Sequence, residues 1–162
     1  MILGIDPGEL WHGAVRYDWH GRRVIEAHKA LSTADAIAFI RQHADSTELL
    51  AVERVASYGI SGASLLRTAE NGGRFWQVGL DAGLPVDLVY RREVLSRLHV
   101  GPRGTKDSIV RQRMIELHGG GKEAAIGRKA SPGPLYGVSS HAWAALAVAW
   151  VAGARHGDNR RG

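Results

Sequence analysis

The chain has 162 residues, a net charge of +5 and a pI near 10.0. It contains no cysteine, which excludes disulfides, thiolate metal sites and a thiol nucleophile. No apolar run is long enough to cross a membrane, and the first residues read as a strand rather than a signal peptide, so we expect one soluble, cytoplasmic domain.

The N-terminal stretch, residues 1–8, predicts a buried strand that ends in an acid. Its apolar residues 2–5 lead into Asp6 and then into a Pro-Gly turn. Residues 49–52 repeat this arrangement and lead into Glu53. A carboxylate at the edge of a buried sheet must be paired, hydrogen-bonded or bound to a metal. If the two strands are neighbours, both acids face one hard cation; otherwise one acid pairs with an arginine and the other caps a turn.

Between these two strands the pattern predicts a hairpin and a helix. Residues 13–18 and 23–27 read as strands joined by a tight turn at Trp19-His20-Gly21. Ser32 is a typical N-cap for a helix that carries Ile37, Phe39 and Ile40. The first half therefore predicts three antiparallel strands, a helix, and a fourth strand beside the first.

The middle of the chain predicts a long helix, a strand and two further helices. Residues 62–82 have a helical pattern with Gly72-Gly73 inside it. This pair either breaks the segment into two helices or allows close approach of another helix from a second subunit. Residues 86–90 predict a fifth strand, a short helix opens at Arg91, and residues 105–118 form the next helix. The expected apolar faces are Leu65, Leu66, Ala69, Trp76 and Leu80 on the long helix, and Ile109, Met114, Ile115 and Leu117 on the last.

The C-terminal part predicts a loop, a buried helix and a tail. Residues 119–137 contain three consecutive glycines and two prolines, which predicts a mobile loop with a function. Residues 139–154 are apolar on nearly every side except at His141 and Trp143, and predict a buried helix. The polar residues 156–162 predict a disordered tail, which leaves residues 1–155 as the single domain.

The positive charge is concentrated in one segment. Residues 91–129 contain ten basic and four acidic residues, a net charge of +6. Arginine greatly outnumbers lysine in the chain, and its guanidinium group binds phosphate through two parallel hydrogen bonds. A localised basic segment is typical of nucleic-acid-binding proteins, and charge that only keeps the chain soluble is the alternative.

These motifs resemble the RuvC family of Holliday-junction resolvases, and more closely its phage-type branch. The resemblance covers nearly the whole chain up to about residue 150 and rests on residues 4–8 (GIDPG), the strand ending in Glu53, and residues 56–59, 106–107, 110–112, 132–137 and 140–147. It implies an α/β, ribonuclease-H-like fold with a five-stranded mixed sheet, the first three strands antiparallel, and helices on both faces. It also implies a homodimer in the cytoplasm or nucleoid of a bacterial host cell.

The function implied by the resemblance is metal-dependent nicking of Holliday junctions or other branched DNA. Each subunit would bind Mg²⁺ or Mn²⁺ and cut one strand of a four-way junction. By resemblance Asp6 bridges two metals, Glu53 supports the site, and His141 stands where most of the family has an acid. Three residues further on the family has another acid, and this chain has Ala144. The alternative is therefore a branched-DNA-binding protein with weak or lost cleavage.

Several other residues receive predicted roles. Asp107 is the reserve metal ligand, with helix capping as its alternative, and a local hydrogen bond is the alternative for His141. Tyr58 either stacks on an unpaired base or packs as an ordinary turn residue. Besides Tyr58, the expected DNA-binding residues are Arg91, Arg92, Arg97, Arg103, Lys106, Arg111, Arg113, Lys122, Arg128 and Lys129.

One unrelated class shares the opening motif. Sugar kinases and chaperone-type ATPases also begin with a strand that ends in a Gly-x-Asp turn. That architecture needs two such domains and adenosine-binding loops, and 162 residues are too few for it.

Overall fold

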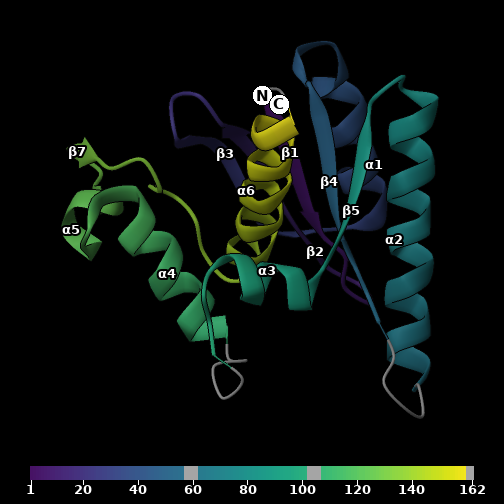
Figure 1. The fold of residues 1–162 in the computed structure, drawn as a ribbon. Helices are drawn as coiled ribbons and strands as arrows, with labels where there is room; N and C mark the ends of the chain where they lie inside the picture. Colours follow the sequence, from purple (N-terminus) through teal and green to yellow (C-terminus); the bar gives the residue numbers. More distant parts are fainter. Residues whose placement is uncertain (57–61, 102–106, 160–162) are drawn as a thin grey trace.

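A computed structural model describes residues 1–56, 62–101 and 107–159. Its centre is a five-stranded sheet in the order β3-β2-β1-β4-β5, with a two-stranded hairpin apart from it (Figure 1). The strands of the main sheet are β1 (Ile2–Asp6), β2 (His12–Asp18), β3 (Arg23–Leu31), β4 (Leu49–Arg54) and β5 (Val86–Tyr90). The α-helices are α1 (Thr33–His43), α2 (Ala63–Asp81), α3 (Arg91–Arg97), α4 (Asp107–Gly119), α5 (Lys122–Ala125) and α6 (Ala142–Asn159).

The sheet has the mixed pairing that the sequence predicts. Strand β1 runs antiparallel to β2 and parallel to β4, and β2 runs antiparallel to β3. The predicted N-cap is confirmed, because the Ser32 hydroxyl accepts the backbone N–H of Asp35 at the start of α1. Strand β3 extends beyond the predicted range to Leu31, where it still pairs with His12.

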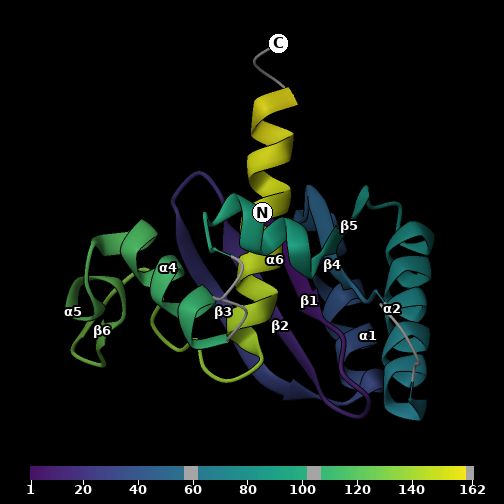
Figure 2. The ribbon, with the colours of Figure 1, turned by 60° about the horizontal axis from the view of Figure 1, so that its bottom comes forward.

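Helices cover both faces of the sheet. Helix α6 lies across one face, and α1 and α2 lie on the other (Figures 1 and 2). Alternating residues of β1 supply the two cores, since Ile2 packs on the α6 side and Leu3 on the α1–α2 side. Small residues let α6 approach closely, because a Cβ atom on Gly4 would lie 2.2 Å from the carbonyl oxygen of Ala145. The buried, alanine-rich helix predicted at the C-terminus is confirmed.

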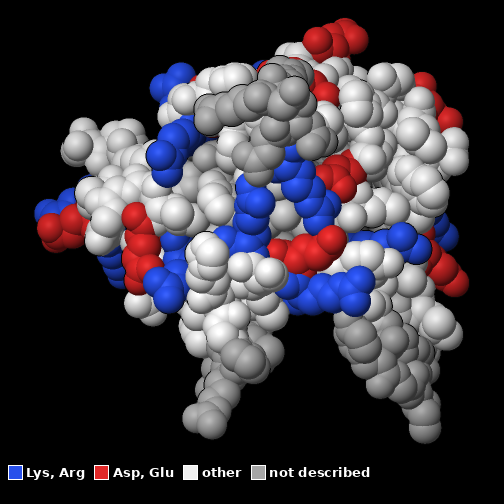
Figure 3. All heavy atoms as spheres, viewed as in Figure 1, with Lys and Arg blue, Asp and Glu red and all other residues white. Residues whose placement is uncertain are grey.

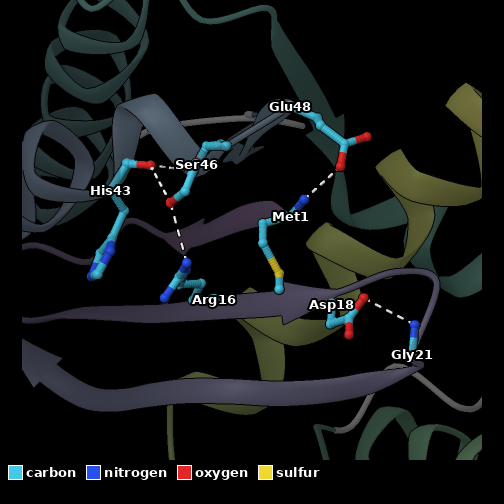
Figure 4. Close-up of polar contacts among 8 residues, drawn as sticks. Met1, Arg16, Asp18, Gly21, His43, Ser46 and Glu48 are labelled. Carbon is cyan, nitrogen blue, oxygen red and sulfur yellow. Dashed lines mark hydrogen bonds and ion pairs between the residues drawn. The ribbon is translucent and has the colours of Figure 1, made fainter.

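A chain of polar contacts fixes the start of β4 beside β1 and β2 (Figure 4). Arg16 on β2 donates to the Ser46 hydroxyl at 3.1 Å, and Ser46 donates to the carbonyl oxygen of His43 at the end of α1. The N-terminal ammonium group of Met1 pairs with Glu48 at 2.7 Å. These contacts lie where the β1–β4 ladder begins with Leu49 opposite Ile2, and the same register continues to Ile5 opposite Val52.

Helix α2 is one continuous helix, so the break at Gly72-Gly73 does not occur. The side of α2 that faces the sheet is formed by Asn71, Phe75, Val78 and Gly79. Gly79 is the glycine that this packing needs, because a Cβ atom there would lie 2.5 Å from the Leu50 side chain. The predicted apolar face points elsewhere: Leu66, Trp76 and Leu80 are 57%, 45% and 48% exposed.

Two predictions for the C-terminal half are wrong. Residues 119–137 are not an unstructured loop, since they contain α5 and the hairpin of β6 (Gly127–Arg128) and β7 (Ser131–Pro132). Leu135 is fully buried, and the carbonyl of Pro134 accepts the N–H of Val24 at 2.7 Å, so the segment is tied to the sheet. The predicted tail also begins too early, because α6 continues to Asn159. Its last turns reach the Trp19 ring, which lies beside Gly157.

The expected apolar stripe of α4 is confirmed in part, at the buried Met114 and at Ile115, which packs against the core. Val110, Met114 and His118 are its buried residues, whereas Leu117 is exposed. The His118 ring donates from Nδ1 to the Met114 carbonyl and accepts the Tyr17 hydroxyl at Nε2, 2.7 Å away, which joins α4 to β2. Within the part of the chain that the structure describes, no helix is long and apolar enough to cross a membrane.

Candidate functional site

The two predicted acids meet at the ends of neighbouring strands. Strands β1 and β4 are parallel, with Ile5 opposite Val52, so the next residues, Asp6 and Glu53, lie side by side near the ends of the two strands. Their carboxyl groups lie close enough that each affects the pKa of the other. Both acids line the same cleft, and a shared cation stays a prediction.

The pair is electrostatically unfavourable without a cation. Burial raises the pKa of Asp6, although the hydrogen bond from Glu53 and the charge of Arg91 oppose that rise. Burial also raises the pKa of Glu53, and the negative charge of Asp6 raises it further. Two carboxyls that each resist ionisation beside the other share a proton or take up a positive ion.

His141 lies next to Asp6, as the sequence predicts. Its Nδ1 atom is 3.4 Å from a carboxylate oxygen of Asp6, and its side chain is 57% exposed. The turn before α6 brings it there: Ser140 has a positive φ of 47°, and the amide of Ala144 donates to the His141 carbonyl. Gly13 on β2 makes room for this turn, because a Cβ atom there would lie 2.3 Å from the His141 carbonyl oxygen.

The three side chains border an open cleft of about 740 Å³ between the sheet end, α4 and the start of α6. Arg91, at the start of α3, pairs with Asp107, which is 91% exposed on the first turn of α4. Asp107 therefore lies across the cleft from the acid pair and uses its carboxylate on an arginine. Ala144 also lines the cleft, at the place where the resemblance implies an acid.

Basic side chains surround an acidic patch on the visible surface. Figure 3 shows blue Lys and Arg side chains on both sides of a red acidic patch over the region of α3. Arg111 lines the cleft with its guanidinium carbon 5.3 Å from the centre of the buried Trp143 ring. This stacking holds the charged group in place and leaves its N–H edges free for a ligand.

Two buried polar residues that the sequence analysis missed hold the loop after Asp6. The side chain of Asn71 on α2 donates to the carbonyls of Gly8 and Glu9 at 3.0 and 3.1 Å. His12 accepts the Gly8 N–H at Nδ1, and its Nε2 lies 3.0 Å from the Thr33 hydroxyl. Both contacts depend on the tertiary fold, so a local sequence pattern gives no signal for them.

The predicted DNA-binding residues that the structure describes lie in four places. Arg91 and Arg111 line the main cleft, while Arg92 and Arg97 line a second groove between α3 and α6. Arg113 pairs with Glu116 on α4. A separate lobe formed by α5 and the β6–β7 hairpin carries three exposed side chains, Lys122, Arg128 and Lys129. Tyr58, Arg103 and Lys106 lie outside the described residues.

The donor set fits a hard divalent cation in part. Two half-buried carboxylates that repel each other are suitable ligands, and Mg²⁺ commonly takes one or two carboxylates and completes its shell with water and phosphate oxygens. Among the described residues, no group of three or more His, Cys, Asp and Glu side chains is arranged to hold a metal. A third ligand such as His141 therefore requires a change of position on binding.

The chain is similar in structure to two solved RuvC structures. One is described as the Thermus thermophilus RuvC structure, with a TM-score of 0.58 and 23% identity over 96% of both chains. The other is T. thermophilus RuvC in complex with Holliday junction substrate, with a TM-score of 0.62 and 21% identity over 96% of this chain and 95% of that one. No protein-family model and no curated protein sequence matches the chain. The likeness confirms the predicted ribonuclease-H-like fold.

Proposed function

We propose that the protein is a metal-dependent endonuclease that nicks Holliday junctions or related branched DNA. The observation that carries this proposal is the pair of Asp6 and Glu53, two carboxyls at the ends of neighbouring parallel strands in a cleft bordered by arginines. The structural similarity to a RuvC that was solved with a Holliday junction substrate supports the choice of DNA. Membership of the phage-type branch stays a prediction from the sequence.

Each group in the cleft has a role that follows from its chemistry. Asp6 and Glu53 would hold Mg²⁺ or Mn²⁺, with the exposed His141 imidazole as a nitrogen ligand. When bound, such ions activate water and stabilise the charge on the leaving oxygen of a phosphodiester. Arg91 and Arg111 bind and orient the phosphates on either side of the acids. Asp107 keeps Arg91 directed across the cleft and is the reserve ligand.

We infer that the protein acts as a homodimer through α2. Leu66, Trp76 and Leu80 form an exposed apolar stripe on the side of the helix that faces away from the sheet. Gly73 lies on the same side, and a Cβ atom there would meet nothing within 4 Å, so the surface is open to a partner. Symmetric cutting of two strands requires two sites related by a twofold axis, which a second copy of the chain supplies.

A second function has one specific observation in its favour. Ala144 lines the cleft where the resemblance implies a further acid, and the described residues contain no complete metal cage. With this deficit, the protein recognises branched DNA and cuts it weakly or not at all. The basic residues of the cleft are the same for both functions, so DNA binding alone does not distinguish them.

The test is a cleavage assay on a synthetic four-way junction. Each of the four strands is labelled in turn and incubated with the protein and Mg²⁺, Mn²⁺ or EDTA, and the nicks are mapped. An endonuclease gives symmetric, metal-dependent nicks near the branch point, and linear duplex of the same sequence stays intact. Tight, structure-selective binding without nicks in either metal would instead establish the binding protein.

A further inference from the structure

A further depression, distinct from the main cleft and from the α3–α6 groove, adjoins the acid pair on the side away from His141. It has a volume of about 350 Å³ and is bordered at one end by Asp6 and Glu53. Its other end is formed by Arg54, Tyr90 and Arg92. Arg54 follows Glu53 directly, and it is paired with Tyr90 at the last position of the β4–β5 ladder. The strand ends that position the acids therefore also position this group.

The Tyr90 ring organises the two arginines. The guanidinium carbons of Arg54 and Arg92 lie 5.2 and 5.0 Å from the ring centre. The backbone of Tyr90 is itself fixed, since its N–H donates to the Glu93 carboxylate at 2.6 Å. A guanidinium group stacked on an aromatic ring keeps its N–H donors in the plane, pointing outward, and loses less side-chain freedom when it binds.

Neither Arg54 nor Arg92 has an ion-pair partner among the described residues. Neighbouring arginines differ in this respect, because Arg91 pairs with Asp107 and Arg155 pairs with Asp87 and Glu93. Glu93 is close enough for the Arg92 charge to lower its pKa, but the Glu93 carboxylate forms its ion pair with Arg155. Two positive groups held together on one ring, with no ion pair of their own among the described residues, form a site for an anion with several oxygen acceptors.

We propose that Arg54 and Arg92, held by Tyr90, bind a second phosphate of the DNA strand, next to the phosphate that lies over Asp6 and Glu53. This inference rests on the proposed function and adds a subsite to it. The ligand is a phosphodiester rather than a base, since guanidinium groups already cover the Tyr90 ring on which a base would stack. The subsite fixes the path of the strand along the β4–β5 edge and so sets which bond reaches the acids.

The test measures junction binding in EDTA, where no cutting is needed. Labelled four-way junction is titrated with wild-type protein and with Arg54→Gln, Arg92→Gln and the double variant over a range of salt concentrations. Affinity falls as salt rises, and each substitution is expected to make this fall less steep by about one unit of the slope of log affinity against log salt. The double variant should make it less steep by about two units. The control is Arg41→Gln on α1, an exposed arginine on the opposite face of the sheet, and its slope should equal that of wild type.

A second arm locates the phosphate and tests the role of Tyr90. Single phosphates around the branch point are replaced in turn by neutral methylphosphonates. At one position the replacement should weaken wild-type binding severalfold and have no effect on the double variant. Tyr90→Phe, which keeps the ring, should bind as wild type does, and Tyr90→Leu should bind more weakly.

The outcomes separate the subsite from the proposed function. If the salt slopes of both arginine variants equal that of wild type and only Tyr90→Leu binds more weakly, Tyr90 stacks on a base and the arginines bind no phosphate. This result would overturn the inference. Lowered slopes in a protein that makes no nicks would support the subsite and refute the endonuclease. If the arginine variants nick normally and have the same salt slope as Arg41→Gln, the proposed endonuclease function is retained and the phosphate subsite is refuted.

Discussion

The raised pKa values of Asp6 and Glu53 determine how cutting should depend on pH. Burial raises the pKa of both carboxyls, so both take up protons at a higher pH than exposed acids do. A divalent cation binds the deprotonated carboxylates, so protons displace the cation as the pH falls. We expect the acid limb of the nicking rate to lie above the usual carboxyl range of about pH 4. Raising the Mg²⁺ concentration should move this limb to lower pH, and a limb that stays in place would argue against cation binding by the pair.

His141 should decide the metal preference. Its imidazole lies 3.4 Å from Asp6, and we propose it as a nitrogen ligand, which would suit Mn²⁺ better than Mg²⁺. We expect His141→Ala to abolish nicking without loss of junction binding, and His141→Asp to raise cutting in Mg²⁺ relative to Mn²⁺. His20→Ala, an exposed histidine on the β2–β3 turn, is the matched control. Equal nicking by His141→Ala and wild type in both metals would show that His141 is structural.

Gly13 should matter because of the space it leaves for His141. An alanine there would place its Cβ atom 2.3 Å from the His141 carbonyl oxygen, so the turn before α6 must shift. A displacement of about 1 Å at a catalytic group can reduce the rate by about a hundredfold. Gly13→Ala should therefore lower nicking at least tenfold while junction affinity changes little. Gly121→Ala, which meets nothing within 4 Å, should cut normally. Full activity of Gly13→Ala would contradict this role.

At the scale of elements, α2 carries the prediction of a homodimer. Its inner side packs on the sheet, and its outer side leaves Trp76 45% exposed. Burying this ring against its copy contributes on the order of 2 kcal/mol, and a charge there would be desolvated at a cost. Trp76→Glu should therefore give a monomer in light scattering. Ile25→Glu on β3, 41% exposed, should leave the dimer intact. A wild-type protein that is monomeric at micromolar concentration would contradict the prediction.

The elements also differ in how well the sequence predicts them. Strands β1 and β4 each have an apolar run ended by an acid, and the helix after Ser32 has a typical N-cap, so local patterns were sufficient there. Residues 119–137 contain regular elements despite their glycines, because some of these glycines allow close packing. A Cβ atom on Gly133 would lie 2.5 Å from the carbonyl oxygens of Ala124 and Ala125. A composition pattern does not distinguish a glycine that bends a loop from one that allows close contact.

At the scale of the whole molecule, the acids were predictable and their surroundings were not. Asp6, Glu53 and His141 come from motifs that can be read directly along the chain. Their surroundings depend on contacts between residues far apart in the sequence. Examples are the hydrogen bond from Asn71 to Gly8, the close approach of Gly13 to His141, and the contact of Arg54 with the Tyr90 ring. The predicted basic face has a similar limit, because net charge locates a segment but not a surface. Its described residues are divided between the cleft, the α3–α6 groove, the Arg113–Glu116 pair on α4 and the α5 lobe.

The most direct test of the central claim is to compare nicking and junction binding in Asp6→Asn. This change keeps the shape of the side chain and removes the charge that a cation needs. We expect the variant to bind a four-way junction in EDTA at least as tightly as wild type, since one repulsion from the phosphates is lost, and to make no nicks in Mg²⁺ or Mn²⁺. Nicking at the wild-type rate by Asp6→Asn would contradict the assignment of this carboxyl pair as the metal-dependent centre.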